Sequence, residues 1–161
     1  MKTIRLKAGK ERSLQRQHPW IFESAIAKGS ADAGETVRVE SHEGVFLAWA
    51  AFSPTSRIRA RVWSFDKAQR IDNSFIQGLI QKSVNARSLF DIQSNGMRLV
   101  HGESDGLPGL VVDRYADTLV AQFTSCGTER FKQVMADALL AATGLTKLYE
   151  RSDANVRSLE G

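Results

Sequence analysis

The spacing of apolar residues changes near residue 70, and this change constrains the fold more than any other feature of the sequence. Before it, apolar and polar residues alternate within short segments, which is the pattern of β-strands. After it, apolar residues first recur every three to four positions, which is the pattern of an amphipathic helix. We therefore expect two modules in this chain of 161 residues, with a boundary between residues 66 and 74.

The first module consists mostly of predicted strands. Four segments have strand length and either alternate or are continuously apolar: KTIRLK (2–7), TVRVES (36–41), VFLAWAAF (45–52) and RIRARVWSF (57–65). The run at 45–52 is apolar throughout, so we expect it to be buried on both faces. Residues 9–17 leave room for one or two helical turns. Short strands separated by turns that contain Gly and Pro predict a small β-barrel.

The second module combines helices with strands. One apolar stripe predicts a helix over 72–91 with Asp72 as its N-cap, and another predicts a helix over 128–143 that ends at Gly144. Four further segments are strand-like: MRLVHGE, GLVVDRY, TLVAQFTS and TKLYER. We therefore expect an α+β protein, in which the β-barrel is followed by an α+β unit of antiparallel strands and two helices.

The segment HGESDGLPG, residues 101–109, raises the question of whether it is a catalytic loop or a chain reversal. Asp105-Gly106 is a turn dipeptide, and Pro108-Gly109 matches the central pair of a type II turn. The flanking residues are strand-like. We therefore favour a structured turn, with a positive φ at Gly106 and local backbone hydrogen bonds to the carboxylate of Asp105.

The alternative interpretation of this segment is a metal site in a small metal-dependent enzyme. His101, Glu103 and Asp105 are spaced by two, so they would lie on one face of a strand and could bind a metal ion together. However, Gly102 and Gly106 disfavour a regular strand, and the sequence offers no second cluster of His or Cys to complete the site. We assign no metal ligand.

The sequence contains no other recognisable catalytic set. It lacks the Gly-rich phosphate loops, the G-x-S-x-G turn and paired cysteines. Its single cysteine, Cys126, ends a strand just before a helix; a reactive thiolate is conceivable there, and a buried small residue is favoured. One cysteine forms no internal disulfide, which fits the cytoplasm. No apolar run approaches the roughly 20 residues of a membrane span, so we expect no membrane partner.

Positive charge is concentrated in the first module. Residues 1–70 carry 13 Lys and Arg against 7 Asp and Glu, whereas residues 71–161 carry 9 against 11. This asymmetry indicates that the first module faces a polyanion. An unevenly charged solvated surface is the alternative.

The segment RIRARVWSF carries the clearest binding signal. A strand period of two puts Arg57, Arg59 and Arg61 on one face, about 7 Å apart, which is close to the spacing of successive phosphates. Guanidinium groups also bind phosphate through two hydrogen bonds. Trp20 could stack on an exposed base, although a place in the core of the barrel is favoured. The other candidate RNA-binding residues are Lys7, Lys10, Arg12, Arg16 and His18.

These segments resemble a known family. Residues 16–22, RQHPWIF, and 34–65, from GETVRVES to RVWSF, are similar to the PUA domain, a small β-barrel that binds RNA. Residues 98–123, RLVHGESDGLPGLVVDRYADTLVAQF, and 148–161, LYERSDANVRSLEG, resemble the central α+β domain of bacterial PUA-containing rRNA methyltransferases. In those enzymes a Rossmann-like domain that binds S-adenosylmethionine follows. Ala116 stands where the family commonly has glycine in a hairpin turn, which leaves the geometry of that turn open.

The resemblance implies that residues 1–70 form a PUA-like RNA-binding domain and residues 71–161 a central α+β domain that is incomplete at its C-terminal end. The chain would then be an N-terminal fragment, or truncated copy, of a 23S rRNA (cytosine-C5) methyltransferase, with large-subunit rRNA as its partner and a homodimer allowed. The intact parent would use S-adenosylmethionine and a cysteine adduct at cytosine C6. This chain holds neither the cofactor loop nor that cysteine, so we assign it no cofactor and no catalytic residue. A free-standing PUA-type RNA-binding protein without catalytic activity is the alternative.

Overall fold

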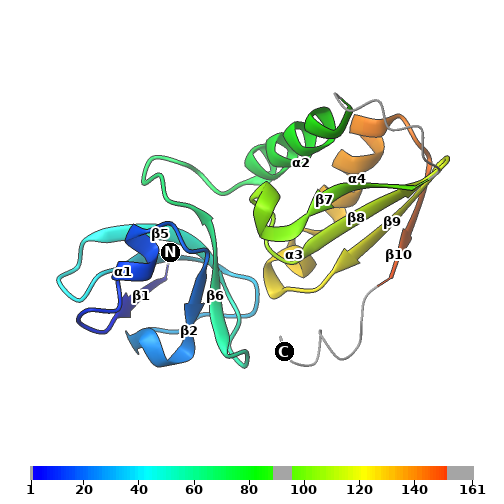
Figure 1. Ribbon diagram of the computed structural model, residues 1–161. Helices are drawn as coiled ribbons and strands as arrows, with labels where there is room; N and C mark the ends of the chain where they lie inside the picture. Colours follow the sequence, from blue (N-terminus) through cyan, green and yellow to red (C-terminus); the bar gives the residue numbers. More distant parts are fainter. Residues whose placement is uncertain (1, 89–95, 152–161) are drawn as a thin grey trace.

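The computed structural model of the protein describes residues 2–88 and 96–151. Two β-sheets are present (Figure 1). Two clusters of buried apolar residues accompany them. We call residues 3–64 the first unit and residues 73–150 the second unit. The α+β class predicted from the sequence is confirmed. None of the helices in the described part of the chain is long and apolar enough to cross a membrane.

Six short strands form the sheet of the first unit. They are β1 (Thr3–Leu6), β2 (Trp20–Phe22), β3 (Ile26–Lys28), β4 (Thr36–Glu40), β5 (Phe46–Phe52) and β6 (Ile58–Ser64). Their order is β2-β6-β5-β4-β1-β3, so β2 and β3 lie at opposite edges. Only the 3-10 turn η1 (Glu23–Ala25) joins these two strands, and so short a connection spans at most roughly 15 Å. The sheet therefore curls until its edges approach each other, as a small barrel requires.

The core of the first unit follows the alternation predicted from the sequence. Val37 and Val39 of β4 are fully buried, and the helical turn α1 (Arg12–Gln15) adds Leu14 to the same cluster. Burial of β5 on both faces, however, holds only for its second half, because Phe46, Leu47 and Trp49 stay partly exposed. Strands β2 and β3 were not predicted. Each has three residues, which is too short to establish a period.

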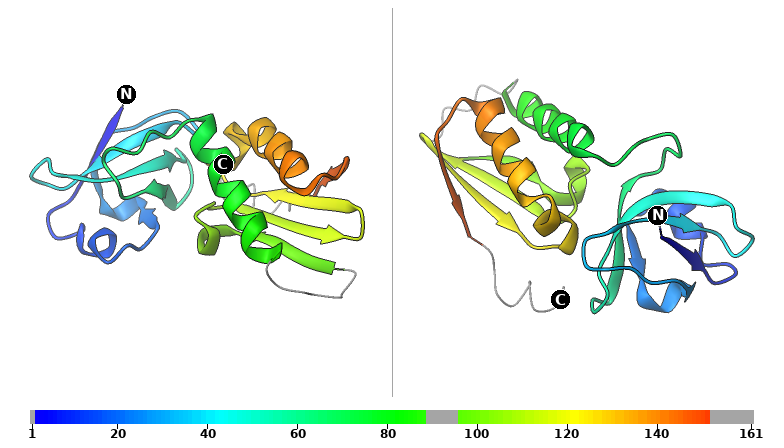
Figure 2. Two further views of the ribbon diagram at one scale, coloured as in Figure 1. Left: turned by 90° about the horizontal axis from the view of Figure 1, so that it is seen from above. Right: turned by 180° about the vertical axis from the view of Figure 1, so that it is seen from behind.

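The second unit is a four-stranded sheet with helices on one face. Its elements are α2 (Asn73–Ser88), β7 (Gly96–His101), η2 (Gly102–Asp105), β8 (Leu110–Tyr115), β9 (Thr118–Phe123), α3 (Cys126–Arg130), α4 (Lys132–Thr143) and β10 (Lys147–Glu150). The order is β10-β9-β8-β7, and Figure 2 shows α2 and α4 side by side over the sheet. The neighbours are antiparallel, as expected, except that β10 runs parallel to β9. The helices α3 and α4 provide the crossover that a parallel pair needs.

The helix ends agree well with the predicted capping residues. Asp72 accepts a hydrogen bond from the backbone N–H of Phe75 at 2.9 Å, which confirms it as the N-cap of α2. The predicted end of that helix at residue 91 lies outside the described residues. Gly144 has φ +71° and ends α4, as expected. The single helix predicted over 128–143 is instead two helices, which meet at Phe131.

The hairpin between β8 and β9 contains Ala116, which stands where the similar family commonly has glycine. Tyr115 pairs with Thr118, so the loop has two residues, Ala116 and Asp117. Ala116 adopts φ +54°. A positive φ at the first loop position is the geometry that hairpins usually fill with glycine. The turn therefore keeps a glycine-type conformation although an alanine occupies it.

We predict that Ala116→Gly raises the free energy of unfolding by about 1 kcal/mol, because the left-handed conformation strains any residue that has a Cβ. Urea denaturation of the variant and the unsubstituted protein measures the difference. Equal or lower stability of the glycine variant would show that the alanine is not strained in this turn.

Candidate nucleic-acid interface

The candidate interface begins at the edge of the first sheet, where β2 pairs with β6. Trp20 lies opposite Arg61, and Ile21 lies opposite Ala60. Ile21 and Ala60 are buried in the core. Because side chains alternate along a strand, Trp20 and Arg61 lie on the other face of the pair. We call this the outer face of β2 and β6.

The outer face carries the arginines predicted from the sequence, but in three different environments. Arg57 is exposed and has no ion-pair partner among the described residues. The Arg59 side chain is 23% exposed, and its guanidinium donates to a carboxylate oxygen of Glu23 at 3.0 Å. The Arg61 side chain is only 14% exposed and lies 3.9 Å from Glu103 of the second unit. Of the three arginines only Arg57 is exposed, and Arg61 is the most covered.

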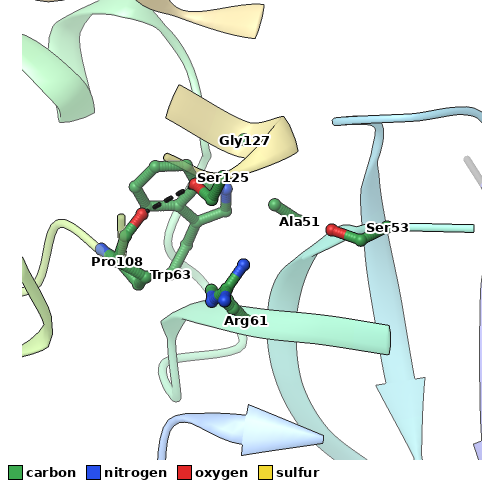
Figure 3. A pocket seen from close by; sticks show the side chains of 7 residues that line it. All are labelled: Ala51, Ser53, Arg61, Trp63, Pro108, Ser125 and Gly127. Atoms are coloured by element: carbon green, nitrogen blue, oxygen red, sulfur yellow. Dashed lines mark hydrogen bonds between the residues drawn. The ribbon is translucent and has the colours of Figure 1, made fainter. Parts of the chain in front are cut away.

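The burial of Arg61 has a clear physical cause in the contact between the two units. Pro108 and Ser125 of the second unit line the same pocket as Arg61 and Trp63 of the first unit (Figure 3). The alternation of β6 correctly predicts which face Arg61 occupies. It carries no information on whether another part of the chain covers that face.

Aromatic residues line β2 beside these arginines. The rings of His18 and Trp20 meet edge to face at 6.0 Å, and those of Trp20 and Phe22 do so at 6.4 Å. We call these three residues the aromatic strip. His18 and Phe22 are exposed, whereas Trp20 is half-buried. Phe22 was not among the predicted site residues, because β2 is too short for its period to be established from the sequence.

Trp20 does not take the place in the core of the barrel that the sequence analysis favours, and its role in RNA binding stays a prediction. Its indole N–H donates a hydrogen bond to Glu103 at 2.9 Å, so its polar edge is directed to the second unit. It does not belong to the apolar cluster of the first unit. Trp20 therefore connects the two units.

The remaining predicted residues lie in the segment that leads into β2. Lys7, Lys10, Arg12 and Arg16 are all exposed, and none has an ion-pair partner in the part of the chain that the structure describes. Arg12 and Arg16 are four residues apart across the helical turn α1, so they lie on the same side of it. The backbone N–H of His18 donates to the carbonyl of Ser13, which ties this segment to the aromatic strip.

The segment 101–109 is a structured turn, as the sequence analysis favours. Gly106 has φ +72°. The carboxylate of Asp105 accepts the backbone N–H of His101 at 2.7 Å and both ends of the Arg87 guanidinium at 3.0 and 2.9 Å. These contacts confirm the predicted conformation of Gly106 and the local hydrogen bond to Asp105.

The same contacts separate the three residues considered as metal ligands. Asp105 binds Arg87, whereas Glu103 is directed to Trp20. Within residues 2–88 and 96–151, no group of three His, Cys, Asp or Glu side chains could hold a metal ion. Cys126 is half-buried rather than fully buried, and it begins helix α3.

The contact between the units depends on a glycine. Ala51 of β5 and Trp63 of β6 belong to the apolar cluster of the second unit, and the ring of Trp63 meets Phe131 edge to face at 5.8 Å. Gly127 of α3 lies directly against them. A Cβ on Gly127 would be 2.7 Å from that of Ala51 and 3.0 Å from the Trp63 ring. The close packing of α3 against the first unit therefore requires a residue without a side chain.

Comparison with known proteins adds the family context. Residues 4–65 match a family model described as a PUA-like domain. The chain is 44% identical over 162 residues to the ribosomal RNA large subunit methyltransferase I of Pseudoalteromonas translucida, with 98% of this chain and 41% of that protein covered. The protein of the same name from Escherichia coli O9:H4 is 42% identical over 161 residues, with 97% and 40% covered. The chain thus spans about two fifths of the length of these relatives.

Two solved structures share the fold. One, described as a SAM-dependent methyltransferase from Streptococcus mutans, superposes with a TM-score of 0.82 at 17% identity, over 94% of this chain and 41% of its own. Another methyltransferase, SMU.776, was solved in complex with SAH and gives a TM-score of 0.84 at 18% identity, over 97% and 41%. At this level of identity the comparison establishes the arrangement of both units and nothing more specific.

We predict that Gly127→Ala lowers the free energy of unfolding by about 1–3 kcal/mol, because the added methyl group overpacks the contact with Ala51 and Trp63. Gly78→Ala is the matched control. Gly78 lies within α2 with open space around it, so alanine there should be neutral or stabilise the helix by up to about 1 kcal/mol. Urea denaturation compares the two variants, and equal stabilities would mean that the units do not pack as closely as described.

Proposed function

We propose that this chain is the RNA-binding and positioning region of a 23S rRNA (cytosine-C5) methyltransferase. The premise is its homology, over nearly its whole length, to the bacterial ribosomal RNA large subunit methyltransferases I, together with its PUA-like domain at residues 4–65. Large-subunit rRNA is the proposed partner. Residues 1–70 and 71–161 are the proposed domains, and the cytoplasm is the proposed location.

The observation that carries the proposal is a set of exposed cations beside exposed rings. Several basic residues of the first unit are exposed and lack ion-pair partners among the described residues, and those nearest to the outer face of β2 and β6 or in the segment that leads into β2 are Lys7, Lys10, Arg12, Arg16 and Arg57. Two of the three rings of the aromatic strip are also exposed. A cation without an ion-pair partner can bind a phosphate without first breaking an ion pair. Contacts to phosphates fix the register of an RNA without selecting its sequence.

The chemistry belongs, in this proposal, to parts of the parent enzyme that these 161 residues do not supply. The methyl donor would be S-adenosylmethionine, and the nucleophile would be a cysteine outside this chain. The residues described here would hold the rRNA so that a separate pocket reaches the target cytosine. This division is efficient because phosphate contacts set the position of the RNA, while an active site that takes a base out of its stack selects the base.

We predict that exchanging Arg12, Arg16 and Arg57 for alanine weakens binding to fragments of large-subunit rRNA and reduces its salt dependence. Each phosphate contact contributes about −0.7 to −0.9 to the slope of log K against log salt, so the triple variant should lose about 2 to 3 units of slope. The loss should be similar for RNAs of different sequence. Fluorescence anisotropy at several salt concentrations measures the slope.

The matched control exchanges three exposed basic residues outside the first sheet, Arg70, Lys82 and Arg130. It removes the same charge and should leave the slope unchanged. Circular dichroism confirms that both variants are folded. An equal loss of slope in both variants would mean that binding depends on net charge alone, and no RNA binding by the unsubstituted chain would overturn the proposed function.

We further predict that the 161-residue chain does not bind S-adenosylmethionine. Its sequence contains no Gly-rich turn between a strand and a helix that is followed by an acidic residue at the distance typical of nucleotide-binding folds. Isothermal titration calorimetry tests this directly. Binding in the micromolar range would contradict the assignment of the cofactor to another part of the parent.

A further inference from the structure

We propose that the edge strand β2 binds an unpaired stretch of RNA, with a base stacked on Phe22 and phosphates held beside Arg57 and Arg59. The inference rests on the proposed RNA-binding function. It adds the class of RNA that this surface takes and the residue that distinguishes this class from a duplex.

Phe22 is the large apolar side chain of this surface that remains most exposed in the described part of the chain. Phe22 is 46% exposed, although the residue before it on the strand, Ile21, is buried in the core. A phenyl ring forms no strong hydrogen bonds, so its exposed face is apolar surface in contact with water. The face of an unstacked base is a flat apolar partner that covers such a ring, as in proteins that bind single strands.

Trp20 supports this role but does not take it. Its N–H is bonded to Glu103, and its ring is flanked by both other members of the aromatic strip. These contacts leave Trp20 half-buried and fix its orientation. Phe22, packed edge to face against a fixed indole, is therefore held in place before RNA arrives, which lowers the entropy lost on binding.

The charges next to Phe22 favour a polyanion over an apolar peptide. Phe22 pairs with Ile58 across a register shift that follows Ile21, and the backbone N–H of Glu23 donates to the carbonyl of Arg57 at 2.8 Å, so Arg57 lies close to Phe22. The guanidinium of Arg59 is bonded to Glu23, the residue that follows Phe22. Glu23 is 62% exposed, and a surface ion pair of this kind contributes at most about 1 kcal/mol. A phosphate can therefore replace Glu23 as the partner of the Arg59 guanidinium at a small cost in free energy.

The combination of a free ring with nearby cations indicates an unpaired strand. In a duplex the bases stack on each other, and the A-form helix offers phosphates and groove edges but no free base faces. The basic segment from Lys7 to Arg16 would serve a duplex and a single strand equally well. Phe22 contributes only when a base is free to leave its stack, so it sets the preference between them.

The test compares one RNA in two forms. A single-stranded oligoribonucleotide of about 12 nucleotides, which is within the range of known single-strand sites, and the same strand annealed to its complement are titrated by fluorescence anisotropy at equal salt. The unsubstituted chain should bind the single strand more tightly. Phe22→Ala should weaken binding of the single strand by roughly 5- to 100-fold, as expected for one lost stack, and leave binding of the duplex unchanged.

Two further variants separate stacking from a general effect of the substitution. Phe22→Trp keeps a stacking surface and should retain the affinity for the single strand. Val45→Ala truncates another exposed apolar side chain of the first unit, 59% exposed, and should have no effect. Thermal melting shows whether each variant is folded.

The outcomes distinguish this inference from the proposed function on which it rests. If the chain binds RNA but Phe22→Ala binds the single strand as the unsubstituted chain does, or if both variants of Phe22 lose the same affinity for duplex and single strand, the inference is wrong and RNA binding stands. If the unsubstituted chain binds neither form, the proposed function and the inference fall together.

Discussion

The packing of Trp63 and Ala51 against helix α3 determines which surfaces of the first unit remain available. Both residues belong to strands of the first sheet and yet are buried in the core of the second unit. Gly127 permits the close approach, since a side chain at that position would meet Ala51 and Trp63. A contact that buries a tryptophan stabilises by a few kcal/mol. The two units are therefore joined by an apolar core rather than only by the chain between them.

This contact also divides the outer face of β2 and β6 into two parts. Next to the second unit, Trp20 and Arg61 are turned toward Glu103. Farther along the strands, Phe22 and Arg57 remain exposed. Trp20 and Arg61 share this face through the pairing of β2 with β6, and Phe22 contacts Trp20 edge to face across the register shift in β2. The packing of the second unit separates the residues of this surface that hold the molecule together from those free to meet a ligand. The same surface thus has a structural end and an exposed end, to which we assign the proposed contact with RNA.

The sequence predicts local structure well here and contacts between distant segments poorly. Periodicity identifies the longer strands and the two helical regions, and Asp72 and Gly144 mark helix ends because capping depends on neighbouring backbone atoms. The three-residue strands β2 and β3 are too short for any period. The burial of Arg61 depends on residues more than 40 positions away. No local pattern encodes such a contact. The sequence therefore predicts which face of the strand carries Arg57, Arg59 and Arg61, but it does not predict how exposed each of them is.

Counting basic residues likewise overstates the surface that can bind RNA. Arg38 and Arg5 both donate to Glu40, and these hydrogen bonds hold the pKa of that carboxyl below its usual range. Both guanidinium groups are therefore bonded to one carboxylate within the first sheet, which compensates one of their two positive charges. Their positive charge still adds to the long-range field of the unit, but phosphate would have to compete with a carboxylate held by two guanidinium groups. The cations of the segment from Lys7 to Arg16 meet no such competition among the described residues.

The turn at residues 101–109 shows why acidic residues near a histidine need not form a reactive site. Asp105 closes the turn on itself through the backbone of His101 and anchors it to Arg87 on helix α2. Glu103, two residues earlier, is directed across the boundary between the units to Trp20. Both oxygens of Asp105 are occupied by donors, so this carboxylate is poorly available to a metal ion or a substrate proton. The spacing of two between Glu103 and Asp105 suggested a metal site. In the structure it lets one turn stabilise the second unit through Asp105 and hold the aromatic strip of the first unit through Glu103.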